Sequence, residues 1–345
     1  MKILVVKLSA FGDMIHALPA LDDLLCQPEV SEVHWLVDMR YAFVSEIFPK
    51  NVVVHTVAMR GKQALASTWR LVRQLKKERF DVILDMQGLL KSALMARSSG
   101  SNVYGFDQKY LREKASTWFI QPVTFHPDEK HVVQQYRRIA MAPFTPHPGL
   151  SPPSALAYKP PRIEIAQTCI NRDKNLLQQL KLTNRQFIVL HTAGGWETKQ
   201  LPEQSWLTIA KALNSSEKIP VFSWGTLAEK TLAHKLAEQC NGFALPEKLN
   251  MSALCTLLKG ARAVVGADTG LLHLAAALGT PTITFWGPSA SWRSAPFADT
   301  EKQGDQHWHI ESNPACGPCF KRSCDHFICM DAIDPESITG ILRKI

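Results

Sequence analysis

The sequence predicts an α/β fold of two doubly wound domains, and three observations support this prediction. Short runs rich in β-branched residues alternate with amphipathic helical patterns, which is typical of parallel sheets. The alternation occurs twice along 345 residues, a length at which one hydrophobic core usually gives way to two domains. A proline-rich stretch separates the halves. We therefore expect domains at 1–145 and 163–334, a linker at 146–162 and a C-terminal helix at 335–345.

The first half contains four predicted strands. They lie at residues 3–8, 33–37, 52–57 and 82–84. An apolar-periodic stretch from Met14 to Leu25 predicts a helix between the first two strands. Before the fourth strand, one helical stripe carries Leu65, Trp69, Val72 and Leu75. This order of strands and helices predicts the first doubly wound domain.

The linker is predicted from its density of helix and strand breakers. Between Pro143 and Pro161 the chain carries Pro146, Pro148, Gly149, Pro152, Pro153 and Pro160. The alternation then resumes, with strands predicted at 187–190, 221–224, 263–266 and 282–285. Open parallel sheets bind ligands at the carboxyl ends of their strands, so we expect an active site in a cleft between two facing domains.

Composition excludes several classes of protein. Apolar residues make up 46% of the chain and charged residues 20%, which is typical of a globular protein and not of a disordered one. No apolar run is long enough to span a bilayer, and the N-terminus lacks a signal-peptide pattern, so we expect a cytoplasmic protein. The net charge of +8 predicts anionic partners. The basic residues lack the pattern of a nucleic-acid module, so nucleic acid is not an expected partner.

A glycine turn leads from the first predicted strand into a helix. Gly12 permits close backbone approach, and Asp13 falls in the first helical turn, where the helix dipole favours an ionised carboxylate. A carboxylate at the carboxyl end of a strand can act as general base toward a hydroxyl group. The alternative is an aspartate that only caps the helix. Asp13 is therefore a candidate catalytic residue.

A second polar turn, Gly-Ala-Asp-Thr-Gly-Leu-Leu-His, joins a strand to a helix in the second half. The backbone N–H groups near Gly270 and Leu271 and the hydroxyl of Thr269 form a cradle for a diphosphate. Asp268 belongs to the same turn, and His273 lies one turn into the helix, where it adds a donor. The alternative is a capped helix with a hydrogen-bonded core histidine.

The segment after the strand at 187–190 is a third candidate for phosphate binding. Small residues including Gly194 permit close approach of a phosphate, and Lys199 supplies a positive charge. The segment is not a Walker loop, and the first half contains no G-x-G-x-x-G sequence. A dinucleotide-dependent oxidoreductase is therefore disfavoured.

Four cysteines lie within one short segment near the C-terminus: Cys316, Cys319, Cys324 and Cys329. In a reducing compartment their spacing suits a four-thiolate structural site for zinc or iron. A redox-active C-x-x-C pair and unligated thiols in an irregular loop are the alternatives.

Together these motifs resemble the bacterial ADP-heptose:lipopolysaccharide heptosyltransferases, inverting enzymes of the two-domain GT-B architecture with Rossmann-like domains. The resemblance runs over nearly the whole chain and is specific because of the order and spacing of segments 7–13, 16–21, 85–93, 268–279 and 285–288. The first half is most similar to heptosyltransferase I, which adds heptose to the Kdo residue of Kdo-lipid A. The cysteine segment is more similar to heptosyltransferase II.

The resemblance implies a role for each candidate residue. Asp13 would be the catalytic base. The donor would be bound by Lys199, by Gly194 and by the turn that contains Asp268, Thr269, Gly270, Leu271 and His273. The acceptor would be bound by Arg60, Lys91 and Arg112. Two features depart from the family. Glycines follow Ala193 where the family often has threonines, and no glutamate follows Trp224-Gly225 until Glu229.

The implied activity is transfer of a heptose from ADP-L-glycero-D-manno-heptose to the Kdo or inner-core region of lipopolysaccharide. No catalytic metal is expected, and a peripheral contact with the cytoplasmic face of the inner membrane is expected. Two alternatives stay open. One is a heptosyltransferase that acts on a protein acceptor, and the other is a non-catalytic regulatory protein that binds nucleotide sugars.

Overall fold

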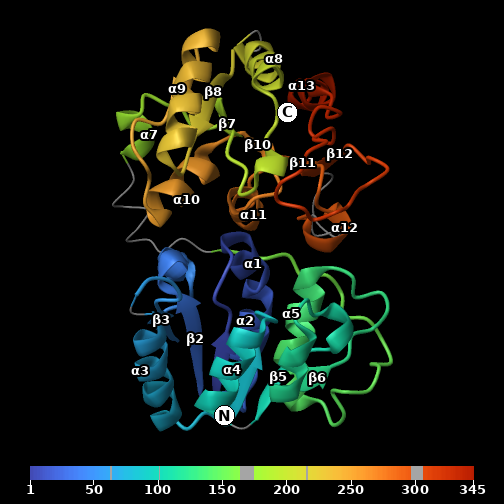
Figure 1. Ribbon diagram of the computed structural model, residues 1–345. Helices are drawn as coiled ribbons and strands as arrows, with labels where there is room; N and C mark the ends of the chain where they lie inside the picture. The colour runs from blue at the N-terminus through green and yellow to red at the C-terminus, as the bar shows by residue number, and fades with distance from the viewer. Residues whose placement is uncertain (63, 101, 164–174, 215–216, 297–305) are drawn as a thin grey trace. The chain divides into compact units, whose positions relative to one another are not determined.

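The computed structural model divides into two compact units, Met1–Pro161 and Arg162–Ile345 (Figure 1). It describes residues 1–62, 64–100, 102–163, 175–214, 217–296 and 306–345. Within these residues each unit contains a parallel six-stranded sheet with helices between successive strands. The predicted α/β fold of two doubly wound domains is confirmed. The division lies at the C-terminal end of the predicted linker.

In unit 1, which is Met1–Pro161, the strand order is β3-β2-β1-β4-β5-β6. These strands are β1 (Lys2–Val6), β2 (Glu32–Asp38), β3 (Val52–Val57), β4 (Val82–Asp85), β5 (Val103–Phe106) and β6 (Gln121–Val123). The direction of winding reverses at β1, so the carboxyl ends of β1 and β4 form the switch point where doubly wound sheets bind ligands.

The helices of unit 1 form two layers. The α-helices are α1 (Phe11–His16), α2 (Leu18–Leu25), α3 (Ala64–Lys77), α4 (Leu90–Ser99) and α5 (Val132–Met141). The 3-10 helices are η1 (Met39–Ile47), η2 (Gln108–Tyr110), η3 (Lys114–Phe119) and η4 (Ala142–Phe144). Helices α1 and α2 pack with α5, whereas α3, α4 and η3 pack beside one another.

Helix α3 forms where the apolar stripe predicts it, but only the C-terminal part of the stripe is buried. Leu71 and Leu75 are buried, whereas Leu65 is 87% exposed and Trp69 60% exposed. Leu71 and Leu75, four residues apart, face the core, whereas the N-terminal half of the predicted stripe, Leu65 and Trp69, faces solvent.

The proline-rich segment is attached to unit 1. Thr124 donates through its backbone N–H to Pro148 and through its hydroxyl to Gly149. Further along, the carboxylate of Glu129 accepts from the N–H of Leu156. A cavity of about 280 Å³ borders this segment beside α5, and none of the predicted site residues lines it. Much of the predicted linker therefore packs as part of the first unit.

In unit 2, which is Arg162–Ile345, the strand order is β12-β11-β10-β7-β8-β9. The strands are β7 (Phe187–His191), β8 (Ile219–Ser223), β9 (Phe243–Ala244), β10 (Ala263–Ala267), β11 (Thr282–Trp286) and β12 (His307–Glu311). The helices are α7 (Leu176–Gln179), η5 (Glu197–Lys199), α8 (Glu203–Asn214), α9 (Leu227–Cys240), α10 (Met251–Gly260), α11 (Gly270–Ala277), α12 (Ser291–Ser294) and α13 (Pro335–Leu342).

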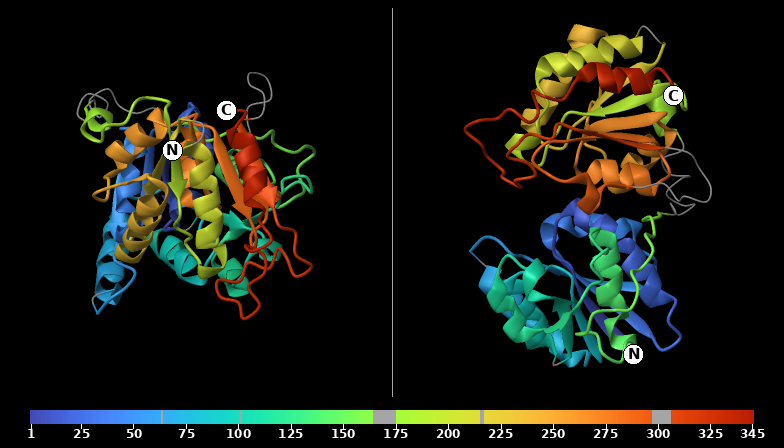
Figure 2. Two further views of the ribbon diagram at one scale, coloured as in Figure 1. Left: turned by 90° about the horizontal axis from the view of Figure 1, so that it is seen from above. Right: turned by 90° about the vertical axis from the view of Figure 1, so that its right-hand side faces the viewer.

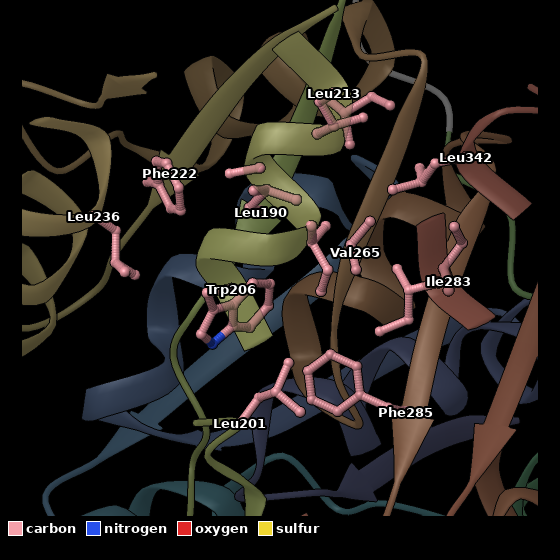
Figure 3. Close-up of a cluster of buried hydrophobic side chains, with 14 of the residues drawn as sticks. Leu190, Leu201, Trp206, Leu213, Phe222, Leu236, Val265, Ile283, Phe285 and Leu342 are labelled. Atoms are coloured by element: carbon pink, nitrogen blue, oxygen red, sulfur yellow. The ribbon is translucent and has the colours of Figure 1, made fainter. Parts of the chain in front are cut away.

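The core of unit 2 lies between the sheet and α8, α9 and α13 (Figure 3). Trp206 of α8 is 1% exposed and meets Phe285 of β11 edge to face, with ring centroids 5.7 Å apart. The C-terminal helix α13 lies beside α8 (Figures 1 and 2) and adds Leu342 to the core. Across the part of the chain that the structure describes, no helix is both long and apolar enough to cross a membrane.

Candidate active site

Asp85 organises the switch point of the unit 1 sheet. It ends β4 and is fully buried, and its carboxylate accepts from the N–H groups of Gln87 and Gly88 and from the hydroxyl of Ser92. The side-chain oxygen of Gln87 in turn accepts from the N–H groups of Leu8 and Ser9, both at 2.9 Å. The end of β4 therefore fixes the loop that leaves β1. Burial raises the pKa of Asp85 to about 6, although its hydrogen bonds and Lys7 oppose the rise.

Asp13 lies beyond this fixed loop, in the first turn of α1. Its Oδ2 accepts from the backbone N–H of Ala10 at 3.2 Å, so the capping role that we kept as an alternative is present. The side chain is nevertheless 46% exposed, and Lys7 Nζ lies 3.9 Å from Oδ2. Lys7 itself is buried against the ring of Tyr136, 4.9 Å from its centroid. An exposed carboxylate at the carboxyl edge of the sheet is accessible to a substrate hydroxyl, as a general base must be.

The three predicted acceptor-binding residues follow three strands of the same sheet. Arg60 follows β3, Lys91 opens α4 after β4, and Arg112 follows β5, and all three are exposed. In a parallel sheet the carboxyl ends of the strands share one edge, so these cations belong to the edge that carries Asp13.

The same edge contains a pair that the sequence analysis missed. Asp38 ends β2 and is 2% exposed, and it binds the Arg40 guanidinium at 2.6 Å. Burial favours a higher pKa for Asp38, but Arg40 and Lys91 lower it overall. The sequence feature that could have identified Asp38 is a single carboxylate at the end of a buried strand, the same position that Asp85 occupies on β4.

In unit 2, Lys199, Asp268 and His273 form one buried group. Lys199 Nζ donates to the Asp268 carboxylate at 2.6 Å and to its backbone carbonyl at 2.7 Å. The ring Nε2 of His273 lies 3.0 Å from the other carboxylate oxygen. Burial alone would raise the pKa of Asp268, but the charge of Lys199 and the contact with His273 hold it well below its usual range. Residues predicted from separate motifs therefore meet in one ionised cluster.

The loop that carries Lys199 is packed tightly around it. The ring centroid of Trp196 lies 4.3 Å from Lys199 Nζ and 5.5 Å from the Arg322 guanidinium. A Cβ on Gly194 would lie 3.0 Å from the Trp196 carbonyl oxygen and 3.1 Å from Lys199 Cβ. The absence of a side chain at Gly194 therefore lets the loop close on Lys199. Its predicted contact with the donor stays a prediction.

Three hydroxyl groups near the carboxyl edge of the unit 2 sheet have no hydrogen-bond partner among the described residues. They belong to Thr192 after β7, Thr269 after β10 and Ser289 after β11. Because β7, β10 and β11 are neighbours in the sheet, these hydroxyls share one edge. A buried hydroxyl without a partner costs free energy, so a ligand that accepts hydrogen bonds here is favoured.

The start of α11 adds backbone donors to this edge. Thr269 is the N-cap of the helix but makes no side-chain cap, and Gly270 and Leu271 open the first turn. The side chain of Leu271 is buried, so only its N–H group can serve a ligand. First-turn N–H groups have no partner within a helix and attract anions. The edge therefore combines the Lys199 ammonium group, three hydroxyls and helix N–H groups, a set suited to a phosphate or diphosphate.

The side chain of Glu229 caps the N-terminus of α9, the helix that contains it. Its Oε2 accepts from the N–H groups of Gly225 and Thr226 at 2.8 and 2.9 Å, and the hydroxyl of Thr226 accepts from Glu229 N–H. This reciprocal arrangement is a capping box that begins α9. The nearby His191 is buried, which lowers its pKa to about 4, and its Nδ1 contacts the Ser223 hydroxyl. His191 is therefore neutral at physiological pH.

The cysteine segment adjoins the Lys199 loop. The hydroxyl of Thr198 donates to the carbonyl of Lys321 at 2.7 Å. Burial and then the neighbouring Cys319, Cys316 and Cys324 raise the pKa of Cys329. Among the described residues, however, no three His, Cys, Asp or Glu side chains are arranged to hold a metal ion. As they stand, the four thiols do not form a metal site, and the zinc or iron site stays a prediction.

Comparisons with known proteins agree with this geometry. A sequence model of glycosyltransferase family 9 (heptosyltransferase) matches residues 68–326. The lipopolysaccharide heptosyltransferase 1 of Pseudomonas aeruginosa is 31% identical over 94% of this chain and 88% of its own. The protein of the same name from Escherichia coli K12 is 30% identical, over 84% of this chain and 88% of its own.

A solved structure shares the fold over its whole length. The E. coli heptosyltransferase WaaC with ADP-2-deoxy-2-fluoro heptose superposes with a TM-score of 0.71 at 23% identity. The match covers 100% of this chain and 99% of that one.

Proposed function

The chain belongs to glycosyltransferase family 9, the heptosyltransferase family, and we propose that it transfers a heptose from ADP-L-glycero-D-manno-heptose to the Kdo region of the lipopolysaccharide inner core. The names of its relatives, lipopolysaccharide heptosyltransferase 1, support heptose transfer and this class of acceptor. The WaaC structure contains ADP-2-deoxy-2-fluoro heptose, which supports an ADP-linked donor. The observation that carries the proposal is that the buried Lys199–Asp268–His273 group shares the carboxyl edge of one sheet with three hydroxyls that have no partner among the described residues.

The donor side of the reaction is assigned to unit 2. Lys199, the first-turn N–H groups of α11 and the hydroxyls of Thr192 and Thr269 would bind the diphosphate. As the bond between the anomeric carbon and the phosphate oxygen breaks, negative charge grows on the leaving ADP. Fixed donors stabilise that charge without reorganising, because the fold already holds them in place. Asp268 keeps the Lys199 ammonium group at this edge instead of extended into water.

The acceptor side is assigned to unit 1. Asp13 would take the proton of the acceptor hydroxyl as that oxygen bonds to the anomeric carbon, and a single displacement inverts its configuration. Lys7 would act as a positioning residue for this carboxylate, since its Nζ lies 3.9 Å from Oδ2. Arg60, Lys91 and Arg112 would bind the carboxylates and phosphates of the acceptor. A lipid-linked acceptor would place the protein at the cytoplasmic face of the inner membrane.

Product analysis tests the proposal. Purified protein with ADP-heptose and Kdo-lipid A should release ADP and add one heptose, which mass spectrometry detects. Heptose on an added protein and none on Kdo-lipid A would favour the protein-acceptor alternative. ADP-heptose binding without turnover on any acceptor would favour the regulatory alternative.

The metal question has its own test. We propose that the four-cysteine segment supports the donor loop, because Thr198 binds Lys321 and Arg322 stacks on Trp196. A zinc or iron ion on the four thiolates would strengthen that support. Metal analysis of the purified protein tests this: about one zinc or iron ion per chain, lost when Cys316→Ser is combined with Cys319→Ser, would support a metal site that forms when the ion gathers the thiolates. A metal-free wild-type protein would contradict the metal site.

A further inference from the structure

One helical layer of unit 1 has a surface of which the catalytic proposal uses only Lys91. Helices α3 and α4 and the 3-10 helix η3 lie side by side over one face of the sheet (Figure 1). Their inner sides join a single core cluster, to which α3 contributes Leu71 and Leu75, α4 contributes Ala93 and Ala96, and η3 contributes Phe119. Their outer sides form what we call the α3–α4–η3 surface.

The α3–α4–η3 surface carries only positive charge. The three elements contain no acidic residue, and their basic residues, all exposed, are Arg70, Arg73, Lys76, Lys77, Lys91, Arg97 and Lys114. None of these basic residues forms an ion pair with another described residue. The flanking acids are engaged elsewhere, since Glu78 binds Lys2 and Glu113 accepts from the N–H of Leu90.

The opposite helical layer of unit 1, formed by α1, α2 and α5, carries basic residues that are paired with acids. The positive charge of the α3–α4–η3 surface is therefore not simply a consequence of the protein's overall positive charge. There Arg137 and Lys159 pair with Asp23, and Arg138 pairs with the buried Glu129. The cations of that layer are neutralised within the fold. Those of the α3–α4–η3 surface remain available to an external anion.

Large apolar side chains project from the same surface. Leu65 and Trp69 of α3 are joined by Leu94 of α4, 42% exposed, and by Trp118 of η3, 82% exposed. The Arg73 guanidinium stacks 3.8 Å from the Trp69 ring centroid. Exposing two tryptophans and two leucines to water is unfavourable unless something covers them. Tryptophan and the stems of lysine and arginine are favoured where an apolar layer meets a charged one.

We propose that the α3–α4–η3 surface is where the protein binds the surface of a bilayer that contains anionic lipids. The seven cations match the negative headgroups, and each basic side chain near such a surface strengthens binding severalfold. Trp69, Leu65 and Trp118 would enter the boundary between headgroups and acyl chains. The proposed function implies a membrane contact, and this inference locates that contact on unit 1. The inference is argued from the charge and exposure of the surface alone, so it does not depend on which acceptor is used.

Vesicle flotation tests the inference. The full-length protein should float with vesicles of phosphatidylglycerol and phosphatidylcholine in equal parts, and not with phosphatidylcholine alone. Raising the salt from about 0.1 M to about 1 M should weaken the binding, because the Debye length shortens from about 10 to about 3 Å. Lys76→Glu combined with Lys77→Glu should weaken it at least about tenfold. Trp69→Ser should weaken it severalfold.

Matched controls come from unit 2. Lys248→Glu combined with Lys259→Glu makes the same change in net charge at exposed positions, and Trp292→Ser removes another exposed tryptophan. These controls should float like the wild type. With a soluble, deacylated acceptor, the Trp69 and Lys76/Lys77 variants should turn over at the wild-type rate, so loss of membrane binding is distinguishable from failure of the proposed chemistry.

Two results would overturn the inference. One is equal flotation of the surface variants and their unit 2 controls. The other is tighter binding to a homopolymeric RNA than to the anionic vesicles, lost in the Lys76/Lys77 variant, which would assign the surface to nucleic acid.

Discussion

At the scale of the residue, the charges buried in unit 2 are held by one another. Both carboxylate oxygens of Asp268 have a cationic or imidazole partner, and Lys199 Nζ has two acceptors. A buried ion pair is tolerated only when its remaining hydrogen-bonding groups are satisfied. The hydroxyls of Thr192, Thr269 and Ser289 on this edge have no partner among the described residues, and they indicate where a ligand completes the hydrogen bonding.

Replacing Thr192 by Val should change affinity and stability in opposite directions. The substitution removes a buried hydroxyl that has no partner among the described residues, so the free energy of unfolding should stay the same or rise. The affinity for ADP should fall about tenfold, since a hydrogen bond to a charged group contributes about 1.5 kcal/mol or more. Isothermal titration and urea unfolding measure the two effects.

The control for Thr192 is Thr284, which also carries a buried hydroxyl without a described partner but lies within β11. Thr284→Val should have the same effect on stability and none on ADP affinity. Equal loss of ADP affinity in both variants would argue against a phosphate contact at Thr192.

Asp85 predicts a pH dependence of stability. Burial raises its pKa from 3.8 to about 6, so the folded protein holds this proton more tightly than the unfolded chain does. The contribution of this group to stability is therefore greatest below about pH 4, falls as the pH rises to about 6 and is constant above that value, a loss of up to about 3 kcal/mol.

Asp85→Asn removes this titration and tests the prediction. Its free energy of unfolding, relative to wild type, should increase between about pH 4 and about pH 7. Urea unfolding across this range measures the difference, with Asp325→Asn as the control for loss of an exposed carboxyl group. Parallel profiles for wild type and Asp85→Asn would contradict a raised pKa.

At the scale of the element, the site depends on turns that leave parallel strands. Gly88 follows β4 with φ of +69° and donates its N–H to Asp85. A Cβ at this position would lie 3.1 Å from Leu111 and 3.2 Å from Phe106. Glycine is therefore required both by the backbone conformation and by the lack of space.

Gly88→Ala and Gly340→Ala should have opposite effects on stability. The first should lower the free energy of unfolding by about 1–2 kcal/mol, because it combines a strained φ with a close contact. Gly340 lies in α13 with nothing within 4 Å of the added Cβ, so alanine there should raise it by up to about 1 kcal/mol. Thermal unfolding compares the two variants. A stabilising Gly88→Ala would show that the turn can relax.

At the scale of the whole molecule, the regular part of the fold could be predicted from the sequence. The strand at 52–57 has the predicted bounds, because a continuous β-branched run indicates a strand directly. The strands β5, β6, β9 and β12 were not predicted. β6 is three residues long and contains Pro122, and β12 alternates histidine with apolar residues and is only partly buried. The edge strands β6, β9 and β12 lack the apolar pattern that burial on both faces imposes, whereas the edge strand β3 is recognisable from its β-branched run.

The sequence was sufficient to predict which residues belong to the candidate site, but not how they are arranged in space. Asp13, Lys199 and Asp268 lie in turns that composition identifies, whereas the pairing of Lys199 with Asp268 joins segments far apart in the sequence. The Ser289 hydroxyl, which has no partner within the described ranges, and the exposure of Trp69 both depend on packing, which no local pattern encodes. The roles of these residues in transfer stay proposals.

The rate of heptose transfer by Asp13→Asn, compared with wild type and with Asp22→Asn, tests the central claim most directly. Asp22 is a similarly exposed aspartate, with side-chain exposure of 42% against 46% for Asp13. Asp13→Asn should transfer heptose from ADP-heptose to Kdo-lipid A about a hundredfold more slowly or worse, with unchanged donor affinity, while Asp22→Asn keeps the wild-type rate. Wild-type turnover by Asp13→Asn would contradict the account.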